Sequence, residues 1–191
     1  SIDTGTSILA APMTYKVGGV QYIAVMAAWG GGGFPYVPPY SAAYQRGNAG
    51  RIIVFRLDGK PVPLPPLLGK LEIAPEAPAQ APGVTMDTIA QGRALFFTNC
   101  AICHSNQHRS ITPDLRRMQP GTHEVFDKIL LEGLLQPGGM PRWDDVLKPA
   151  EVKAIHAYLI DEQAKTRRDE IEKTKRGVPL DAPALAILSN Y

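Results

Sequence analysis

Cysteine is scarce in this sequence, with only Cys100 and Cys103 among 191 residues. A scaffold held by several disulfides is therefore excluded. An excess of one charge is also missing, because 20 basic and 18 acidic residues leave a net charge of +2. This balance argues against a strongly basic nucleic-acid-binding protein and against an acidic tail protein. Apolar runs are short as well: residues 22–28 fall far below the roughly 18 residues of a transmembrane helix.

Glycine and proline, by contrast, are abundant, with 18 of each. Seven of the prolines lie in residues 60–85. Proline fixes φ and removes a hydrogen-bond donor, so neither a helix nor a central strand fits there. We interpret 60–85 as a semi-extended linker that its leucines pin partly to a surface. Because the chain begins at Ser1 with neither Met nor a signal peptide, we interpret it as a processed or excised piece.

Residues 1–59 have the pattern of a β region. Strand formers fill 9–17 and 20–28, with two glycines between them, and a third strand is predicted over 51–57. Four consecutive glycines at 30–33 and a stretch rich in proline and tyrosine predict a loop before the third strand. Three strands with open edges and an exposed apolar face are not stable alone. We therefore expect the missing strands to come from another part of the protein.

Residues 86–164 have helical patterns. We predict one helix over 87–98 with its first residue as the cap, a second over 122–134, and a third that begins near Pro149. The charged residues that follow, within 165–191, are interpreted as a solvated helix end and an irregular tail. About 80 residues in three short helices bury only a modest apolar core. A cofactor bound inside that core would add buried apolar contacts and so stabilise the domain.

The sharpest signal is Cys-Ala-Ile-Cys-His at residues 100–104. This Cys-x-x-Cys-His pattern indicates the attachment of a c-type haem. Cys100 and Cys103 would form thioethers to two edges of one porphyrin, and His104 would ligate the iron. A methionine as the second axial ligand would raise the potential for electron transfer.

Other interpretations of the cysteine pair have less support. A structural zinc site usually takes four Cys or His ligands, and no pair of histidines stands at the spacing of a zinc finger. A redox dithiol should follow a strand and open a helix, whereas this motif follows a predicted helix. A local disulfide is the third alternative. We expect His108, His123 and His156 on the surface or on helix faces, Trp143 at a haem edge or in the core, and Arg117 near a haem propionate or in water.

Residues 86–160 resemble a class I cytochrome c. In that family a glycine and an aromatic residue lie eight and four positions before the first cysteine, and here Gly92 and Phe96 stand there. An aromatic residue of the last helix is matched by Tyr158. The resemblance implies an all-α domain in which the first and last helices cross at these residues.

The same resemblance implies how the haem iron would be held. A proline after the haem histidine is matched by Pro113, whose carbonyl would accept the imidazole N–H of His104 and fix its tautomer. The ligand methionine of the family lies in a Gly-Met-Pro loop before the last helix, which matches Met140. Met118 is the second candidate, and a bis-histidine or open site is the third.

The order of the three regions resembles the C-terminal part of quinohaemoprotein alcohol dehydrogenases. Segments 10–15, 21–26 and 50–59 look like the final strands of their eight-bladed β-propeller, and the resemblance covers about residues 1–160. The implied fold is mixed, a propeller end followed by an all-α class I cytochrome c domain. Its parts would be the terminal propeller strands in 1–59, a Pro-rich linker in 60–85, the cytochrome c domain in 86–164, and a charged helix end with an irregular tail in 165–191.

This family resemblance also implies cofactors and partners. The remainder of the propeller would hold pyrroloquinoline quinone (PQQ) and Ca²⁺ and oxidise an alcohol by hydride transfer to the quinone. Electrons would pass through haem c to an external acceptor, which is a copper protein, a cytochrome or a quinone-linked subunit. Trp29 and Gly30 are candidates for a PQQ contact, with a core aromatic as the alternative for Trp29. The family's catalytic aspartate and Ca²⁺ ligands lie upstream of this sequence, and the implied location is the bacterial periplasm.

Two alternatives from other classes remain. A stand-alone c-type cytochrome with an accessory β segment would carry electrons without any propeller. A haem-based ligand sensor would need an open sixth position, and Met140 argues against it.

Overall fold

The computed structural model describes residues 1–29, 37–104, 109–110 and 112–180. The chain forms two compact units. The first comprises residues 1–70 with 107–112, and the second comprises 71–106 with the chain from Pro113 onward. The boundary falls inside the predicted 60–85 linker, so the two halves of that linker belong to different units.

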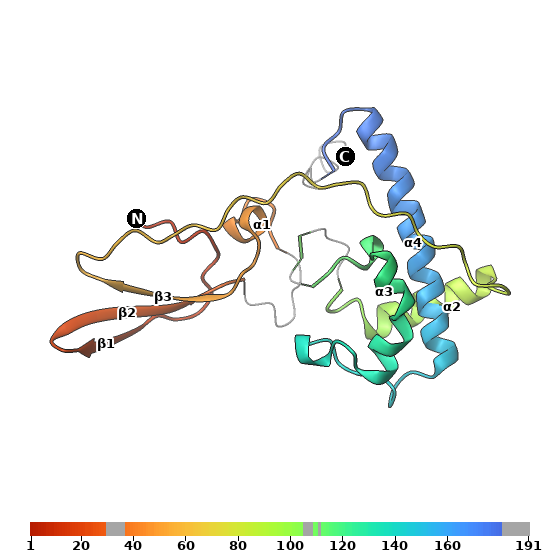
Figure 1. The fold of residues 1–191 in the computed structure, drawn as a ribbon, viewed down its shortest axis with the longest axis horizontal. Coiled ribbons are helices and arrows are strands. Elements are labelled where there is room, and N and C mark those ends of the chain that lie inside the picture. The colour runs from red at the N-terminus through yellow and green to blue at the C-terminus, as the bar shows by residue number, and fades with distance from the viewer. Residues whose placement is uncertain (30–36, 105–108, 111, 181–191) are drawn as a thin grey trace, which may run out of the picture. The chain divides into compact units, whose positions relative to one another are not determined.

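The first unit contains an antiparallel sheet in the order β1-β2-β3 (Figure 1). Its strands are β1 (Met13–Val17), β2 (Val20–Ala27) and β3 (Arg51–Arg56). The β1-β2 hairpin pairs Val17 with Val20 across two glycines, both of which have positive φ. The sequence predicts all three strands, but β1 begins later than expected because Pro12 has no N–H to donate to the ladder.

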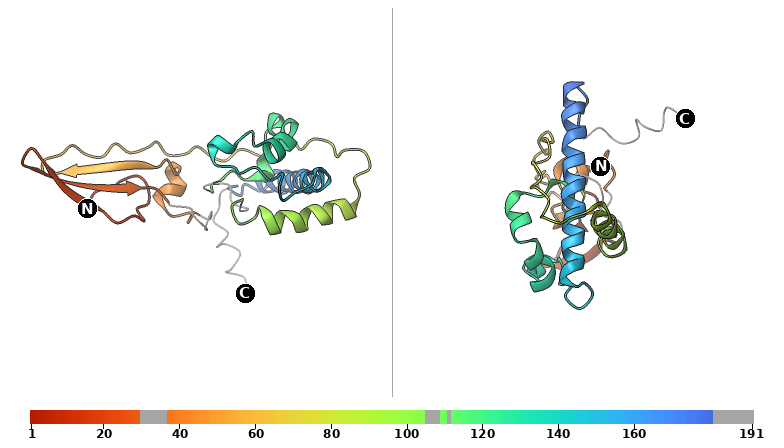
Figure 2. Two further views of the ribbon diagram at one scale, coloured as in Figure 1. Left: turned by 90° about the horizontal axis from the view of Figure 1, so that it is seen from below. Right: turned by 90° about the vertical axis from the view of Figure 1, so that its right-hand side faces the viewer.

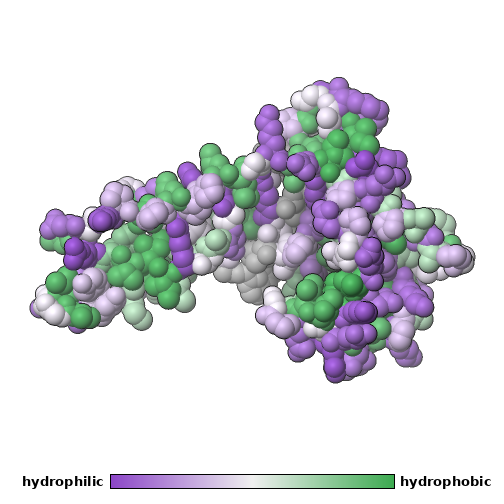
Figure 3. Space-filling model, in the orientation of Figure 1, coloured by the Kyte–Doolittle hydropathy of each residue, from purple (hydrophilic) through white to green (hydrophobic). Residues whose placement is uncertain are grey.

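The sheet leaves large apolar side chains exposed. Met13 and Met26 are 64% exposed and Ile52 is 69% exposed, and a hydrophobic patch covers the strands in Figure 3. Val25 and Ile53 belong to the small buried cluster of the sheet. Exposed apolar area of this kind marks a surface that binds another chain segment or partner. The described residues form this one sheet, and an eight-bladed propeller is not present in them.

A short helix, α1 (Ala42–Arg46), lies where the sequence predicted only loop. Ser41 caps it by accepting a hydrogen bond from the backbone N–H of Tyr44. Ala43 and Tyr44 are buried in a cluster that includes Val37. Five residues are too few to show a helical repeat of apolar positions, so the pattern gave no sign of α1.

Residues 57–84, all described, form neither helix nor strand, as their prolines predict. The first half of this linker is held to the first unit by polar and apolar contacts. The guanidinium of Arg46 donates to the Pro65 carbonyl over 2.6 Å, and the N–H of Leu68 donates to the Gln45 carbonyl over 2.8 Å. Apolar contacts add to these hydrogen bonds, because Val62 packs against the buried cluster of the sheet, although Leu67 is 64% exposed.

The second unit is built on two long helices, α2 (Met86–Asn99) and α4 (Pro149–Lys175). Thr85, rather than Asp87, caps α2: its hydroxyl accepts from the N–H of Thr88, and the Thr88 hydroxyl accepts from the N–H of Thr85. Pro149 occupies the first turn of α4, as expected.

Between these helices the predicted 122–134 helix is two separate elements. These are α3 (Pro120–Glu124) and one π-helical segment, η2 (Lys128–Glu132), which ends at Gly133 in the left-handed conformation. Two short 3₁₀ turns, η1 (Leu115–Arg117) and η3 (Gln136–Gly138), complete the unit. π-helical turns often occur at functional sites, and this one lies beside the cavity described below.

The helices α2 and α4 cross in direct backbone contact (Figures 1 and 2). A Cβ atom added to Gly92 would lie 1.8 Å from the carbonyl oxygen of Ala154. One turn further along α2, the rings of Phe96 and Tyr158 lie 5.5 Å apart between centroids. The helix crossing that the cytochrome resemblance implies is therefore present, at the residues named for it.

The helix α4 continues without a break beyond residue 164, and this last part of the helix contacts other segments of the second unit. Glu170 is 3% exposed, and its carboxylate accepts the N–H of Ala74 over 2.7 Å. The same carboxylate forms an ion pair with Arg117. The second half of the linker is thereby fixed to α4. Among the described residues no helix is both long and apolar enough to span a membrane.

Candidate functional site

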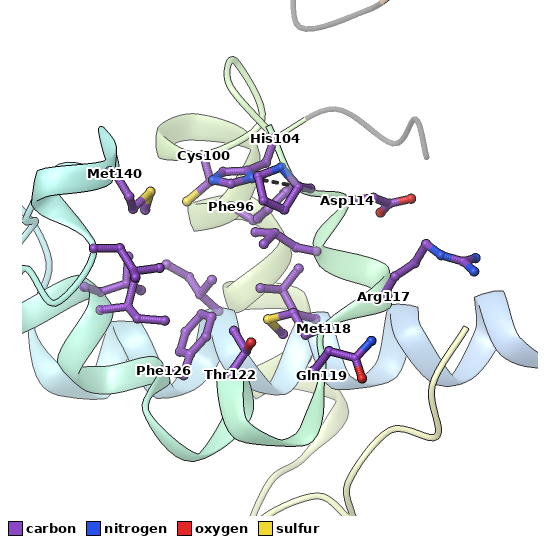
Figure 4. Close-up of a pocket in the computed structure, with 18 residues that line it drawn as sticks. Phe96, Cys100, His104, Asp114, Arg117, Met118, Gln119, Thr122, Phe126 and Met140 are labelled. Atoms are coloured by element: carbon purple, nitrogen blue, oxygen red, sulfur yellow. Dashed lines mark hydrogen bonds between the residues drawn. The ribbon is translucent and has the colours of Figure 1, made fainter. Parts of the chain in front are cut away.

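A cavity of about 490 Å³ lies in the second unit between α2, α4 and the segments that join them (Figure 4). Its volume falls in the range of cofactor and small-molecule sites. Apolar side chains from every surrounding element line it, among them Phe96, Leu115, Met118, Phe126, Leu130 and Leu159.

The Cys-x-x-Cys-His motif forms the turn that follows α2. The N–H of His104 donates to the Cys100 carbonyl over 2.8 Å, which places both side chains on one face of the turn. Cys100 and His104 are buried and line the cavity, whereas Cys103 is exposed. No disulfide joins the two cysteines, both of which are described. Burial raises the pKa of the Cys100 thiol to about 11, and the nearby Cys103 is the second cause. A redox dithiol requires the opposite shift.

His104 is held in one orientation by Pro113. Its Nδ1 lies 3.1 Å from the Pro113 carbonyl oxygen, as the dashed line in Figure 4 shows. Because a carbonyl can only accept, Nδ1 carries the proton and Nε2 keeps its lone pair. A bare Nε2 on a fixed imidazole is the form in which histidine binds a metal ion.

Both candidate methionines line the cavity (Figure 4). Met140 is half-buried in the loop after η3 and follows Gly139, whose φ is 97°. Met118 is 5% exposed, belongs to the main apolar core, and has its carbonyl bound by Gln163. Met140 therefore lies on a loop and Met118 is packed into the wall.

The residues of the cavity fit a haem. The walls are apolar, the imidazole of His104 has a free Nε2, and one cysteine of the pair lies on the cavity surface. Trp143 packs against the same core, and its indole N–H is buried with no partner within the described residues. A buried donor without an acceptor is uncommon in a complete structure. In the described ranges there is no cluster of three His, Cys, Asp or Glu side chains that would hold a metal ion such as zinc.

Three other residues singled out in the sequence have contacts that the sequence did not indicate. Arg117 lines the cavity and its guanidinium binds Glu170 and the Glu72 carbonyl, so it does not face water; a contact with a haem propionate stays a prediction. His123 lies on α3, in agreement with the helix-face alternative, and is buried there, whereas His108 lies outside the described residues. His156 is half-buried beside His123, with their ring centroids 5.2 Å apart.

Of the two candidates for a quinone contact, only Trp29 is among the described residues. Trp29 lies in the first unit, where its backbone N–H and carbonyl both bind the Asn48 side chain. Its ring packs against the cluster of Val37 and Tyr44, which is the arrangement of a core aromatic. Gly30 lies outside the described residues.

Comparisons with known proteins agree with this geometry. Residues 87–159 match the family described as "Cytochrome C oxidase, cbb3-type, subunit III". The chain is 38% identical over 173 residues to quinohemoprotein alcohol dehydrogenase ADH IIB of Pseudomonas putida, which covers 84% of this chain and 23% of that protein. It is 33% identical over 192 residues to the dehydrogenase subunit of alcohol dehydrogenase (quinone) of Komagataeibacter europaeus, with 95% and 25% covered.

A solved structure is also similar. That of quinohemoprotein alcohol dehydrogenase ADHIIG from Pseudomonas putida HK5 has a TM-score of 0.66 and 31% sequence identity. The match covers 90% of this chain and 25% of that chain. The present chain thus spans about a quarter of the length of these relatives.

Proposed function

We propose that this chain is the electron-transfer end of a quinohaemoprotein alcohol dehydrogenase. The match of residues 87–159 to a cytochrome family and the similarity of the chain to about a quarter of the length of these enzymes support the proposal. Cytochrome c domains carry haem c. The observation that supports this function best is the apolar cavity, with Cys100 and the free Nε2 of His104 on its surface.

We propose that four side chains hold the haem. Cys100 and Cys103 would attach the porphyrin, and His104, through Nε2, and Met140 would hold the iron. When bound, haem c supplies a one-electron couple, and a His–Met ligand pair raises its potential. The Pro113 carbonyl keeps the imidazole in its binding tautomer and increases its basicity. The apolar walls would keep water away from the bound haem.

The first unit would belong to the dehydrogenase part. We propose that β1 to β3 are the last strands of a propeller whose remainder holds PQQ and Ca²⁺ and oxidises an alcohol. The exposed apolar side chains of Met13, Met26 and Ile52 support this proposal, because neighbouring strands would cover them. Trp29 and Gly30 stay candidates for a PQQ contact. The electron acceptor would be a copper protein, a cytochrome or a quinone-linked subunit in the bacterial periplasm.

The test uses the full-length enzyme, purified with PQQ and Ca²⁺ and oxidised before use. A primary alcohol is added without any artificial mediator, and the visible spectrum is followed. We expect the haem to become reduced, and a preparation depleted of PQQ to stay oxidised until ascorbate is added. Haem that responds to ascorbate but never to alcohol, in a protein that contains PQQ, would leave only a stand-alone cytochrome.

A further inference from the structure

A row of three hydrogen-bonded side chains lies behind the candidate haem cavity. Nδ1 of His123 is 2.9 Å from Nε2 of His156, and Nε2 of His123 is 3.0 Å from Oε1 of Gln163. The side-chain amide of Gln163 donates to the carbonyls of Met118 and Pro75, each over 3.1 Å. Gln163 is fully buried and His123 is 8% exposed. The function proposed above leaves this row without a role.

The hydrogen-bond partners fix where every proton in the row lies. Two backbone carbonyls bind the amide nitrogen of Gln163, so its Oε1 must accept from His123. His123 therefore carries its proton on Nε2 and, when neutral, accepts at Nδ1 from the Nε2–H of His156. The remaining imidazole nitrogen of the row, Nδ1 of His156, then carries a lone pair that these hydrogen bonds do not use. A proton that binds there requires no other hydrogen bond to change.

The row meets the wall of the cavity at two points. The ring of Phe126 stacks on the imidazole of His156 with centroids 4.3 Å apart and planes 9° apart, and Phe126 also lines the cavity (Figure 4). Met118, whose carbonyl is bound by Gln163, lines it as well. One aromatic ring therefore separates the imidazole of His156 from the cavity.

The other side of His156 faces a second hollow of about 410 Å³. Its charged lining groups are Asp127, which follows α3, and Lys153 on α4, while α2 and the linker contribute the uncharged Thr88 and Gln80. The pKa of His156 is lowered to about 4, chiefly by burial and secondly by the neighbouring His123, while Asp127 opposes both. Burial also lowers the pKa of His123. The solvent-facing imidazole is thus neutral at neutral pH and has a free site for a proton.

We propose that His156 is a redox-linked proton-binding site, at which the domain takes up one proton when its haem is reduced. This inference rests on the haem function proposed above. The dehydrogenase part supplies one electron, which reduces ferric to ferrous iron, and solvent supplies one proton, which binds Nδ1 of His156. Reduction of the iron removes one positive charge from the cavity, which lessens its repulsion of protonated His156. The repulsion is substantial because the Phe126 ring and the surrounding apolar core screen charge poorly. Through a protein interior of low dielectric constant, one unit of charge in the cavity would change the proton affinity of His156 on the order of tenfold.

The test is the reduction potential of the haem-loaded chain as a function of pH. We expect the potential to fall as pH rises from about pH 4 to about pH 5, because the pKa of His156 is about 4 in the ferric state and about one unit higher in the ferrous state, so reduction in this range takes up a proton. The variant His156→Gln keeps an N–H donor for His123 but cannot bind a proton, so its potential should be constant in this range. In Lys153→Gln, which removes a charge from the same hollow, the dependence should remain.

A second measurement identifies the proton site directly. Nuclear magnetic resonance of the His156 imidazole in the ferric and ferrous states should give a pKa that is higher in the ferrous state. The visible spectrum and thermal midpoint of His156→Gln report whether the variant is folded. A potential that does not change with pH in the wild type, or a pH dependence that survives in folded His156→Gln, overturns the inference and leaves the haem function intact. Absence of bound haem would instead refute the function itself.

Discussion

Replacement of Gly92 by alanine is expected to destabilise the second unit by about 3 kcal/mol or more, the upper range for overpacking. The added Cβ would lie 1.8 Å from the carbonyl oxygen of Ala154 and 2.4 Å from its carbonyl carbon. Both are backbone atoms of α4 and cannot rotate away as a flexible side chain would. The helices α2 and α4 would have to separate. Because α2 leads into Cys100 and α4 lines the cavity, haem attachment should decrease as well.

Gly121→Ala is the matched control for this substitution. Gly121 lies in α3, and its added Cβ would meet nothing within 4 Å. Alanine is the better helix former, so we expect no change or a gain of up to about 1 kcal/mol. Urea unfolding of both variants, followed by far-ultraviolet circular dichroism, measures the difference. Equal stabilities for the two variants would contradict a backbone contact at Gly92.

Replacement of Glu170 by glutamine should have the second large effect, a loss of about 3 kcal/mol. The carboxylate is 3% exposed and accepts the N–H of Ala74, and it neutralises Arg117, whose side chain is 13% exposed. Glutamine keeps the shape of the side chain but removes its negative charge. The buried guanidinium of Arg117 then keeps the Glu72 carbonyl as a partner but has no charge to balance its own. The penalty comes from this uncompensated charge more than from the lost hydrogen bonds.

The control for Glu170 is Glu172→Gln, two residues further along the same helix. Glu172 pairs with Lys175, and their side chains are 64% and 65% exposed. Exposed pairs contribute little, so we expect a change within about 0.5 kcal/mol. Amide hydrogen exchange adds a local readout: the N–H of Ala74 should exchange faster in Glu170→Gln and at the wild-type rate in Glu172→Gln. Unchanged protection of Ala74 in the first variant would contradict the contact.

The sequence was most informative where chemistry depends on neighbours along the chain. Cys-x-x-Cys-His lies within one turn, so its spacing alone predicts that Cys100 and His104 share a face. The long helices α2 and α4 were visible because their apolar positions repeat over several turns. The contact of Gly92 with α4 came from the family resemblance, since a glycine by itself does not indicate which segment approaches it.

Features built from distant residues were not predictable in the same way. Glu170 and Ala74 are 96 positions apart, and Gln163 and His123 are 40 apart. Neither pair leaves a periodic pattern in the sequence, and a charged or polar residue on a helix is usually solvated. The break between α3 and η2 was missed for another reason: a π-helical turn keeps apolar residues at nearly helical spacing, so the predicted helix continued through it.

The measurement that tests the central claim most directly is the absorption spectrum of the chain produced with c-type haem maturation, recorded before and after denaturation. We predict haem that stays attached to the denatured polypeptide through Cys100 and Cys103. We also predict, in the native ferric protein, a near-infrared methionine–iron band that survives Met118→Ala and disappears in Met140→Ala. Haem that separates from the denatured chain, or a band that depends on Met118 instead, would contradict the account.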